Sequence, residues 1–132
     1  MGRVQLGRLP ALNAARHEVA RHYHQALSGE TDIRLPELRA VGESSHQMFV
    51  IGVPAERRDS VVRHLQDRGV GASVHFDPPV HEQSAYRSLE PGLQLKNTVM
   101  LARTSITLPI SPVQTPDQTD YVATCLTEAL AQ

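Results

Sequence analysis

The fold of this chain of 132 residues is decided by a stretch near its middle, Val70-Gly71-Ala72-Ser73-Val74-His75-Phe76. Its larger apolar side chains alternate with glycine, serine and histidine, which predicts a strand that buries Phe76 and leaves His75 on the open face. Upstream, residues 46–53 are typical of a strand buried on both faces, and residues 55–68 of a helix. Strand, helix and strand in this order predict an α/β fold.

Further helices flank this unit. Apolar residues recur at steps of three and four from Leu9 to Leu27, which predicts a long helix there. The sequence Thr115-Pro116-Asp117-Gln118 is a capping box with proline at the first helical position, so a last helix is expected to begin here and to bury Cys125. Residues 95–103 are expected to form another helix, and residues 105–108 a short strand. We therefore expect one compact domain.

The composition excludes several classes of function. Lys and Arg number 13 and Asp and Glu 14, so the formal charge of −1 provides no positive field for a nucleic acid. The longest apolar run, residues 48–51, is far too short to span a membrane. A single cysteine cannot form a disulfide within the chain. We expect a soluble, cytoplasmic protein. Its only lysine is Lys96, so any chemistry that requires a lysine amine has to use this residue.

Seven histidines raise the question of a metal site. His17, His22 and His24 lie on the first expected helix, but no two of them are four residues apart, which is the spacing of a helical zinc pair. A solvated helix face explains them better, and we expect no metal. Cys125 occupies an apolar position of the last helix and is expected to be a buried, unreactive thiol.

Two other histidines, His75 and His81, flank the sequence Asp77-Pro78-Pro79. Two interpretations stay open. The segment is either a polar loop with two ordinary histidines, or a rigid loop beside an exposed histidine that suits a hydroxylated or phosphorylated ligand. Gly71 and Ser73 share the open face with His75, so little bulk crowds its ring, and this favours the second interpretation.

An ordered set of motifs resembles the C-terminal part of DegT-type aminotransferases, the pyridoxal-phosphate enzymes that aminate keto-sugar nucleotides. The motifs cover nearly the whole chain and are, in order, Arg58-Asp59, the strand 69–76, Pro79 with His81, Thr107-Leu108-Pro109-Ile110-Ser111-Pro112 and Thr115-Pro116-Asp117-Gln118. The first helix is similar to the one that links the large and small domains of that family.

The resemblance implies an architecture. Residues 1–29 would be the linking helix, and residues 30–132 the small α/β domain of a fold-type I aminotransferase. A mixed sheet of a few strands would be packed by the linking, middle and C-terminal helices. His75 would be the residue that touches substrate, with His46 and His81 as lesser candidates because we expect them to be exposed or in loops.

The family's large domain is missing from the matched region, and with it the Schiff-base lysine, the aspartate on the pyridine nitrogen and the phosphate-binding hydroxyls. Lys96 falls in the small domain, so we expect no catalytic or cofactor-binding residue and no activity from this chain alone. Phe76 replaces a tyrosine that the family often has, and Asp77 adds an acidic group beside a site for an anionic sugar nucleotide.

Two functions therefore remain open. The chain is the C-terminal portion of an aminotransferase that closes over the substrate, or a stand-alone, non-catalytic binding or assembly module derived from that domain. A small metal or regulatory domain is a third and weaker option that rests only on the number of histidines. Loss of a large domain would expose apolar surface on the first helix, so we expect a large-domain polypeptide as partner, or self-association.

Overall fold

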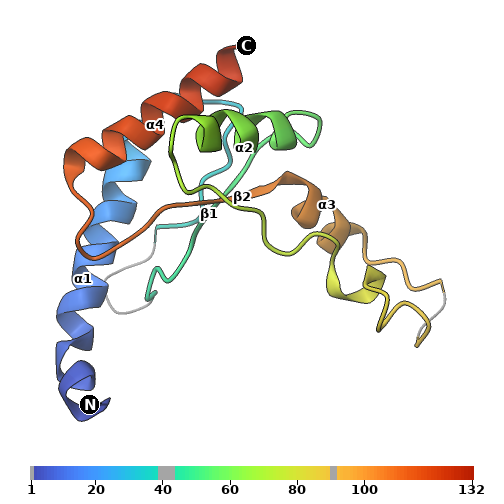
Figure 1. Ribbon diagram of the computed structural model, residues 1–132, viewed down its shortest axis with the longest axis horizontal. Coiled ribbons are helices and arrows are strands. Elements are labelled where there is room, and N and C mark those ends of the chain that lie inside the picture. Colours follow the sequence, from blue (N-terminus) through green and yellow to red (C-terminus); the bar gives the residue numbers. More distant parts are fainter. Residues whose placement is uncertain (1, 39–43, 90–91) are drawn as a thin grey trace.

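The computed structural model describes residues 2–38, 44–89 and 92–132. Along the chain, the elements are α1 (Gly2–Ala26), β1 (Phe49–Gly52), α2 (Arg58–Asp67), the short 3-10 helix η1 (Val80–Glu82), α3 (Lys96–Thr104), β2 (Ser105–Leu108) and α4 (Pro116–Ala131). Figure 1 shows α1, α2 and α4 gathered around the two strands, whereas α3 and the chain before it extend away from them.

The sheet is smaller than the sequence predicts. Strands β1 and β2 pair antiparallel, and the expected strand 70–76 contributes only one antiparallel bridge, in which Ser73 and Thr107 exchange hydrogen bonds of 3.1 and 2.8 Å. Arg34 forms a similar bridge to Gly52 on the β1 side. The prediction of a mixed sheet is wrong for the described residues, where every pairing is antiparallel. Pairing with β2 ends at Ser73, and the chain bends at residues 76–78, before Pro79 and η1.

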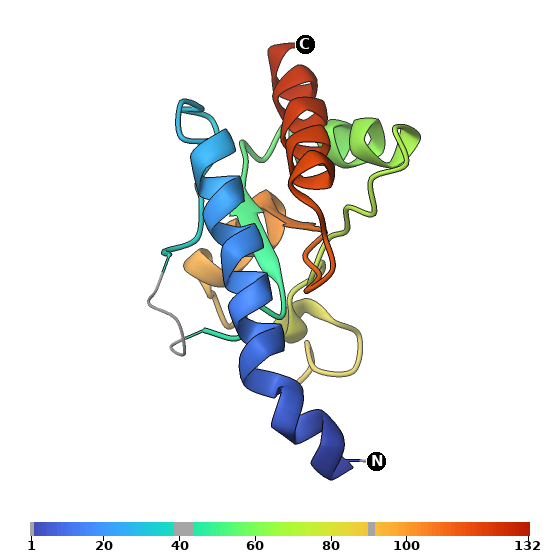
Figure 2. The same cartoon turned by 90° about the vertical axis from the view of Figure 1, so that its left-hand side faces the viewer.

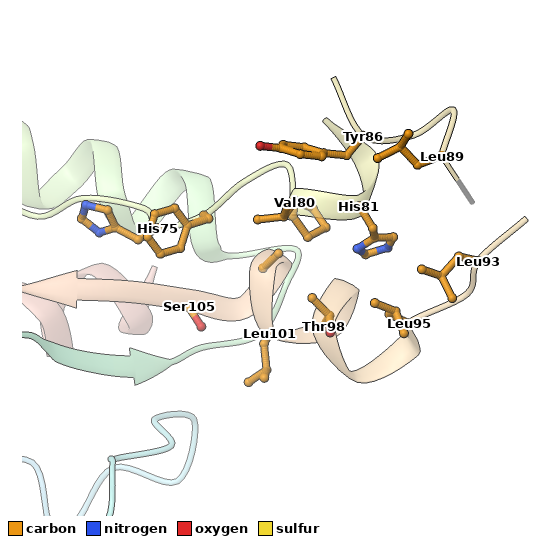
Figure 3. Close-up of a pocket in the computed structure, with 13 residues that line it drawn as sticks. His75, Val80, His81, Tyr86, Leu89, Leu93, Leu95, Thr98, Leu101 and Ser105 are labelled. Carbon is orange, nitrogen blue, oxygen red and sulfur yellow. The ribbon is translucent and has the colours of Figure 1, made fainter. Parts of the chain in front are cut away.

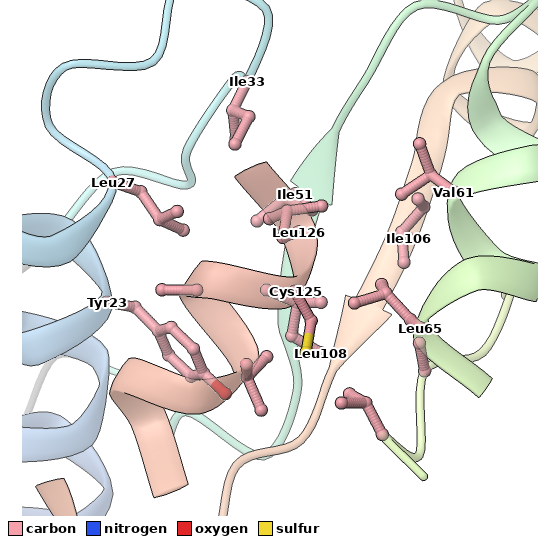
Figure 4. Close-up of a cluster of buried hydrophobic side chains, with 14 of the residues drawn as sticks. Tyr23, Leu27, Ile33, Ile51, Val61, Leu65, Ile106, Leu108, Cys125 and Leu126 are labelled. Atoms are coloured by element: carbon pink, nitrogen blue, oxygen red, sulfur yellow. The ribbon is translucent and has the colours of Figure 1, made fainter. Parts of the chain in front are cut away.

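The core lies between the sheet and the three helices that surround it (Figure 4). Tyr23 of α1 stacks on Phe49 of β1 with ring centroids 4.8 Å apart. The Tyr23 hydroxyl donates to the carbonyl oxygen of Pro109 at 2.8 Å and accepts from Gln114 at 3.1 Å, and burial raises the pKa of Tyr23 to about 12. The prediction of a buried Cys125 is confirmed. These contacts join α1, β1, α4 and the loop before α4 into one packed unit.

Local sequence signals determine two of the helix ends. The predicted capping box of α4 is confirmed, because the Thr115 side chain accepts from the Gln118 N–H and the Gln118 side chain accepts from the Thr115 N–H. Helix α2 ends in a Schellman motif: Gly69 has a φ of 75°, and the N–H of Val70 donates to the Leu65 carbonyl at 2.9 Å. This motif directs the chain from α2 back toward the sheet.

Helix α1 is longer at its start than predicted. It begins at Gly2 rather than near Leu9, and Pro10 lies inside it. A proline removes one backbone hydrogen bond, and that loss has not ended the helix here. Residues 2–10 are all exposed, and Figure 2 shows this end of α1 projecting beyond the rest of the molecule. Helix α2, in contrast, is shorter than the predicted residues 55–68.

Two aromatic side chains, of which the strand alternation predicts Phe76 as buried and the spacing of the last helix places Tyr121 on its apolar face, lie at the surface. Phe76 is 68% exposed, because the chain leaves the sheet before this position. Tyr121 is half-exposed and its hydroxyl donates to the Arg68 carbonyl at 3.0 Å, beyond the end of α2. The strand alternation predicts the side-chain directions correctly as far as His75 and fails at Phe76.

Residues 76–89 and 92–104 form an extension that we call the arm. It contains η1 and α3 and leads directly into β2. In Figure 1 it projects away from the helices that cover the sheet. Large apolar side chains of the arm are exposed, namely Phe76, Val80, Tyr86, Leu89, Leu93, Leu95, Met100 and Leu101. The arm therefore has little core of its own and presents an apolar surface.

Candidate functional site

The arm and the start of β2 enclose a cavity of about 530 Å³ (Figure 3). Its walls are mainly apolar and include Val80, Leu93 and Leu101. The polar side chains along it are His75, His81, Tyr86, Thr98 and Ser105. Small-molecule sites have volumes of roughly 300–1,000 Å³ and combine apolar walls with a few polar groups. This cavity therefore has the size and composition of a binding site.

His75 lies at the end of the cavity nearest the sheet. Its side chain is exposed, as the strand alternation predicts. The ring nitrogen Nδ1 is 3.0 Å from Oγ1 of Thr107 on β2 and 3.5 Å from Oγ of Ser73, and Figure 3 shows the imidazole pointing away from the arm. In the described part of the chain, no hydrogen bond engages Nε2. That nitrogen can donate to a ligand or accept from it, according to the tautomer that Thr107 selects.

His81 belongs to η1 and lines the same cavity from the arm. Its side chain is mostly buried, with Nε2 3.8 Å from a carboxylate oxygen of Glu82. In Figure 3 its ring lies among the arm residues Val80, Leu93 and Leu95. The structure thus brings His75 and His81, which are six residues apart in sequence, to opposite parts of one cavity.

His46 lies elsewhere, and the expectation that it is exposed is wrong. It is only 6% exposed and does not line the cavity. Its ring packs edge to face on His17 of α1 with centroids 5.4 Å apart. Burial, with the nearby His17, His24 and Arg16, lowers the pKa of His46 below its ordinary value of 6.5. His46 was a candidate because it was expected to be exposed, and it is not. Its position therefore gives no support to a role in substrate binding.

The described residues contain no group of three or more His, Cys, Asp or Glu side chains placed to hold a metal ion. His17, His24 and His46 each have a buried ring nitrogen without a hydrogen-bond partner among these residues. Within the same ranges, none of the helices is long and apolar enough to cross a membrane.

Comparison with known proteins identifies the family. The model of the DegT/DnrJ/EryC1/StrS aminotransferase family matches residues 1–127, so the chain belongs to this family. It is 36% identical over 126 residues to the erythromycin biosynthesis sensory transduction protein EryC1 of Saccharopolyspora erythraea, a match that covers 94% of this chain and 34% of that protein.

Solved structures agree with this assignment. The aminotransferase TlmJ from Streptoalloteichus hindustanus matches with a TM-score of 0.87 and 31% identity, over 98% of this chain and 35% of the other. DesV from S. venezuelae, solved in complex with a ketimine intermediate, matches with a TM-score of 0.86 and 29% identity, over 96% of this chain and 34% of the other. The predicted fold class, the small α/β domain of such an aminotransferase, is confirmed. The chain spans about a third of the length of these relatives.

The residues of this chain do not fit the attachment of pyridoxal phosphate at the cavity of His75. Attachment requires a lysine amine, and the only lysine is Lys96. Lys96 is exposed at the start of α3 and lines a second cavity, together with Met100 and Arg103. It does not line the cavity that His75 and His81 share.

The apolar walls of the cavity are what the sequence interpretation missed. Tyr86 and Leu93 line it from a stretch for which no long helix or strand is expected, and Leu101 lines it from the expected helix 95–103. A signal was present, because residues 80–101 contain many large apolar side chains without the continuous period of a buried helix. Such residues in a segment without a core of its own indicate a surface that binds something.

Proposed function

We propose that this chain forms one wall of the substrate site of a sugar-nucleotide aminotransferase. The observation that carries the proposal is the cavity between the arm and β2, which has apolar walls and is lined by His75 and His81 from opposite parts. Membership of the DegT/DnrJ/EryC1/StrS family supports the reaction class, which converts a keto group of the substrate into an amine.

The residues of the cavity have distinct parts in this proposal. His75, held at Nδ1 by Thr107, offers Nε2 to a hydroxyl or carbonyl oxygen of the substrate. The apolar side chains Val80, Leu93 and Leu101 exclude water and pack on the faces of a sugar or a base. Closure of the site over the substrate would come from the arm, which the Arg58 side chain contacts at Asp77 and at Ala102.

The catalytic lysine and the cofactor would come from a polypeptide segment outside the matched third of the relatives. We therefore expect that borohydride reduction of the chain in the presence of pyridoxal phosphate fixes no cofactor at a specific site. Stoichiometric labelling of Lys96, together with amine transfer, would contradict this expectation. A cytoplasmic location stays a prediction.

A non-catalytic assembly module is the second candidate, and exposed apolar side chains favour it. Val4 and Leu6 on the free end of α1, and Leu89 on the arm, are each at least two-thirds exposed. Such surfaces on a chain of this size indicate a partner. Under this candidate the same surfaces bind a large-domain polypeptide or a second copy, but no amine transfer follows.

Reconstitution separates the two candidates. The chain would be co-expressed with the part of the Saccharopolyspora erythraea relative that it does not match, and amine transfer to a keto-sugar nucleotide measured. We expect turnover that depends on both polypeptides and that His75→Ala reduces. His22→Ala is the matched histidine control, because His22 faces Asp120 on α4 at 2.6 Å, and it should turn over as the unaltered chain does. A stable complex without turnover would favour the assembly module.

A further inference from the structure

The start of α2 contacts both ends of the arm through one side chain. Arg58 is the first residue of α2 and is only 8% exposed. Its Nη1 donates to the carbonyl oxygen of Ala102, near the end of α3, at 3.0 Å. Its Nη2 donates to the Asp77 carboxylate, at the beginning of the arm, at 2.5 Å. The third nitrogen, Nε, lies 2.5 Å from a carboxylate oxygen of Asp59 on the same helix.

This arrangement joins two segments that are 25 residues apart in sequence, Asp77 and Ala102, through one buried cation. Hydrogen bonds from a charged donor are stronger than neutral ones, and a guanidinium can serve several acceptors in fixed directions. The arm has no other side-chain bond of this kind to the helices around the sheet among the described residues. The position of the arm relative to the sheet therefore depends strongly on Arg58.

We propose that Arg58 is the positioning residue of the cavity: it fixes both ends of the arm and so sets the distance between His81 on the arm and His75 on the sheet. This inference rests on the proposed function only in assigning a substrate to the cavity. Arg58 does not line the cavity and is not a catalytic residue. Its neighbour Arg57 points elsewhere, donating from Nη2 to the carbonyls of Ala129 and Leu130 at the end of α4.

Two matched pairs of variants test the proposal. Arg58→Lys keeps the charge but cannot reach both acceptors, and Arg57→Lys is its control at the adjacent position. Asp77→Asn weakens the contact at one end of the arm. Asp59→Asn is its control, because Asp59 touches the same guanidinium but belongs to α2. Asp77→Asn also keeps the test valid if Arg58→Lys fails to fold.

Amide hydrogen exchange of the 132-residue chain is the first measurement. Arg58→Lys should raise exchange about tenfold or more across η1 and α3, with little change in β1, β2 or α4. Asp77→Asn should raise it mainly in η1. Both controls should leave the arm unchanged. Equal effects of Arg58→Lys and Arg57→Lys on the arm would overturn the proposal, as would an arm that is unprotected in the unaltered chain.

Kinetics of the reconstituted enzyme distinguish a positioning role of Arg58 from a merely structural one, because only the positioning role predicts a change in KM. Arg58→Lys and Asp77→Asn should raise KM for the sugar nucleotide about tenfold while kcat changes less, because the wall of the cavity is displaced and the chemistry is not. If exchange in the arm responds but no reconstituted complex turns over, the proposed function fails and the positioning role stands. If turnover is present but the variants alter neither exchange nor KM, the positioning role fails alone.

Discussion

The packed helices and the arm use apolar side chains in opposite ways. Around the sheet, apolar residues of α1, α2, α4 and both strands are buried in a single cluster. In the arm, residues of the same kind are exposed or line a cavity. The two phenylalanines of the chain illustrate the contrast, since Phe49 is 0% exposed and Phe76 is 68% exposed.

The difference indicates which part of the molecule supplies stability and which part forms the proposed site. Burial of apolar surface stabilises the domain at about 25 cal/mol per Å², and the described core obtains nearly all of it from the helices and strands outside the arm. The arm can present apolar walls to a ligand because the rest of the molecule folds without burying them. Its position then depends on a few polar contacts, above all those of Arg58.

The largest expected effect compares the two phenylalanines. Phe49→Ala should lower the free energy of unfolding by about 3–5 kcal/mol, because it leaves a cavity beside Tyr23. Phe76→Ala should change it by no more than about 0.5 kcal/mol. Urea denaturation of both variants measures the difference. Similar losses for the two would mean that the arm is part of the core.

A smaller effect tests the start of α4. Thr115→Ala removes the hydroxyl that accepts the Gln118 N–H and should cost about 1 kcal/mol. Thr115→Ser retains an acceptor and should recover most of the loss. The same denaturation experiment measures both, and a Thr115→Ala variant as stable as the unaltered chain would show that the cap is not used in solution.

The smallest effect is a pH dependence of the packed helices. Because the pKa of His46 is lowered in the folded state, the unfolded chain binds more protons below pH 6.5, so stability should fall as the pH falls from about 6.5 toward the folded pKa. His46→Asn should reduce the dependence of the unfolding free energy on pH in this range. Asparagine tolerates the positive φ of 43° at this position. His75→Asn on the sheet edge is the control. If the unfolding free energy of His46→Asn depended on pH as that of the unaltered chain does, the lowered pKa of His46 would be contradicted.

Much of the fold could be predicted from local chemistry. The capping box at Thr115, the buried Cys125 and the strand Ser105–Leu108 are consequences of nearby residues, and the structure has all three. The short pairing of residues 70–76 could not be predicted in the same way. It depends on where the chain leaves β2, and the departing chain contacts Arg58 through Asp77, a residue 19 positions away in sequence.

The candidate site shows the same limit. The open face of the strand pattern located His75, because alternation is a property of the backbone. His46 was misplaced because its burial comes from packing against His17, which is 29 residues away in sequence. The walls of the cavity were missed for the same reason, since they come from an arm whose position depends on distant contacts.

The most direct test uses two adjacent residues with opposite surroundings. Val74 packs against the core, whereas His75 is exposed beside the cavity. Val74→Ala should cost roughly 1–3 kcal/mol of unfolding free energy and leave the turnover of the folded, reconstituted enzyme nearly unchanged. His75→Ala should stay within about 0.5 kcal/mol of the unaltered chain and lower kcat/KM about tenfold. A His75→Ala variant that unfolds as readily as Val74→Ala, or that retains full turnover, would contradict the account.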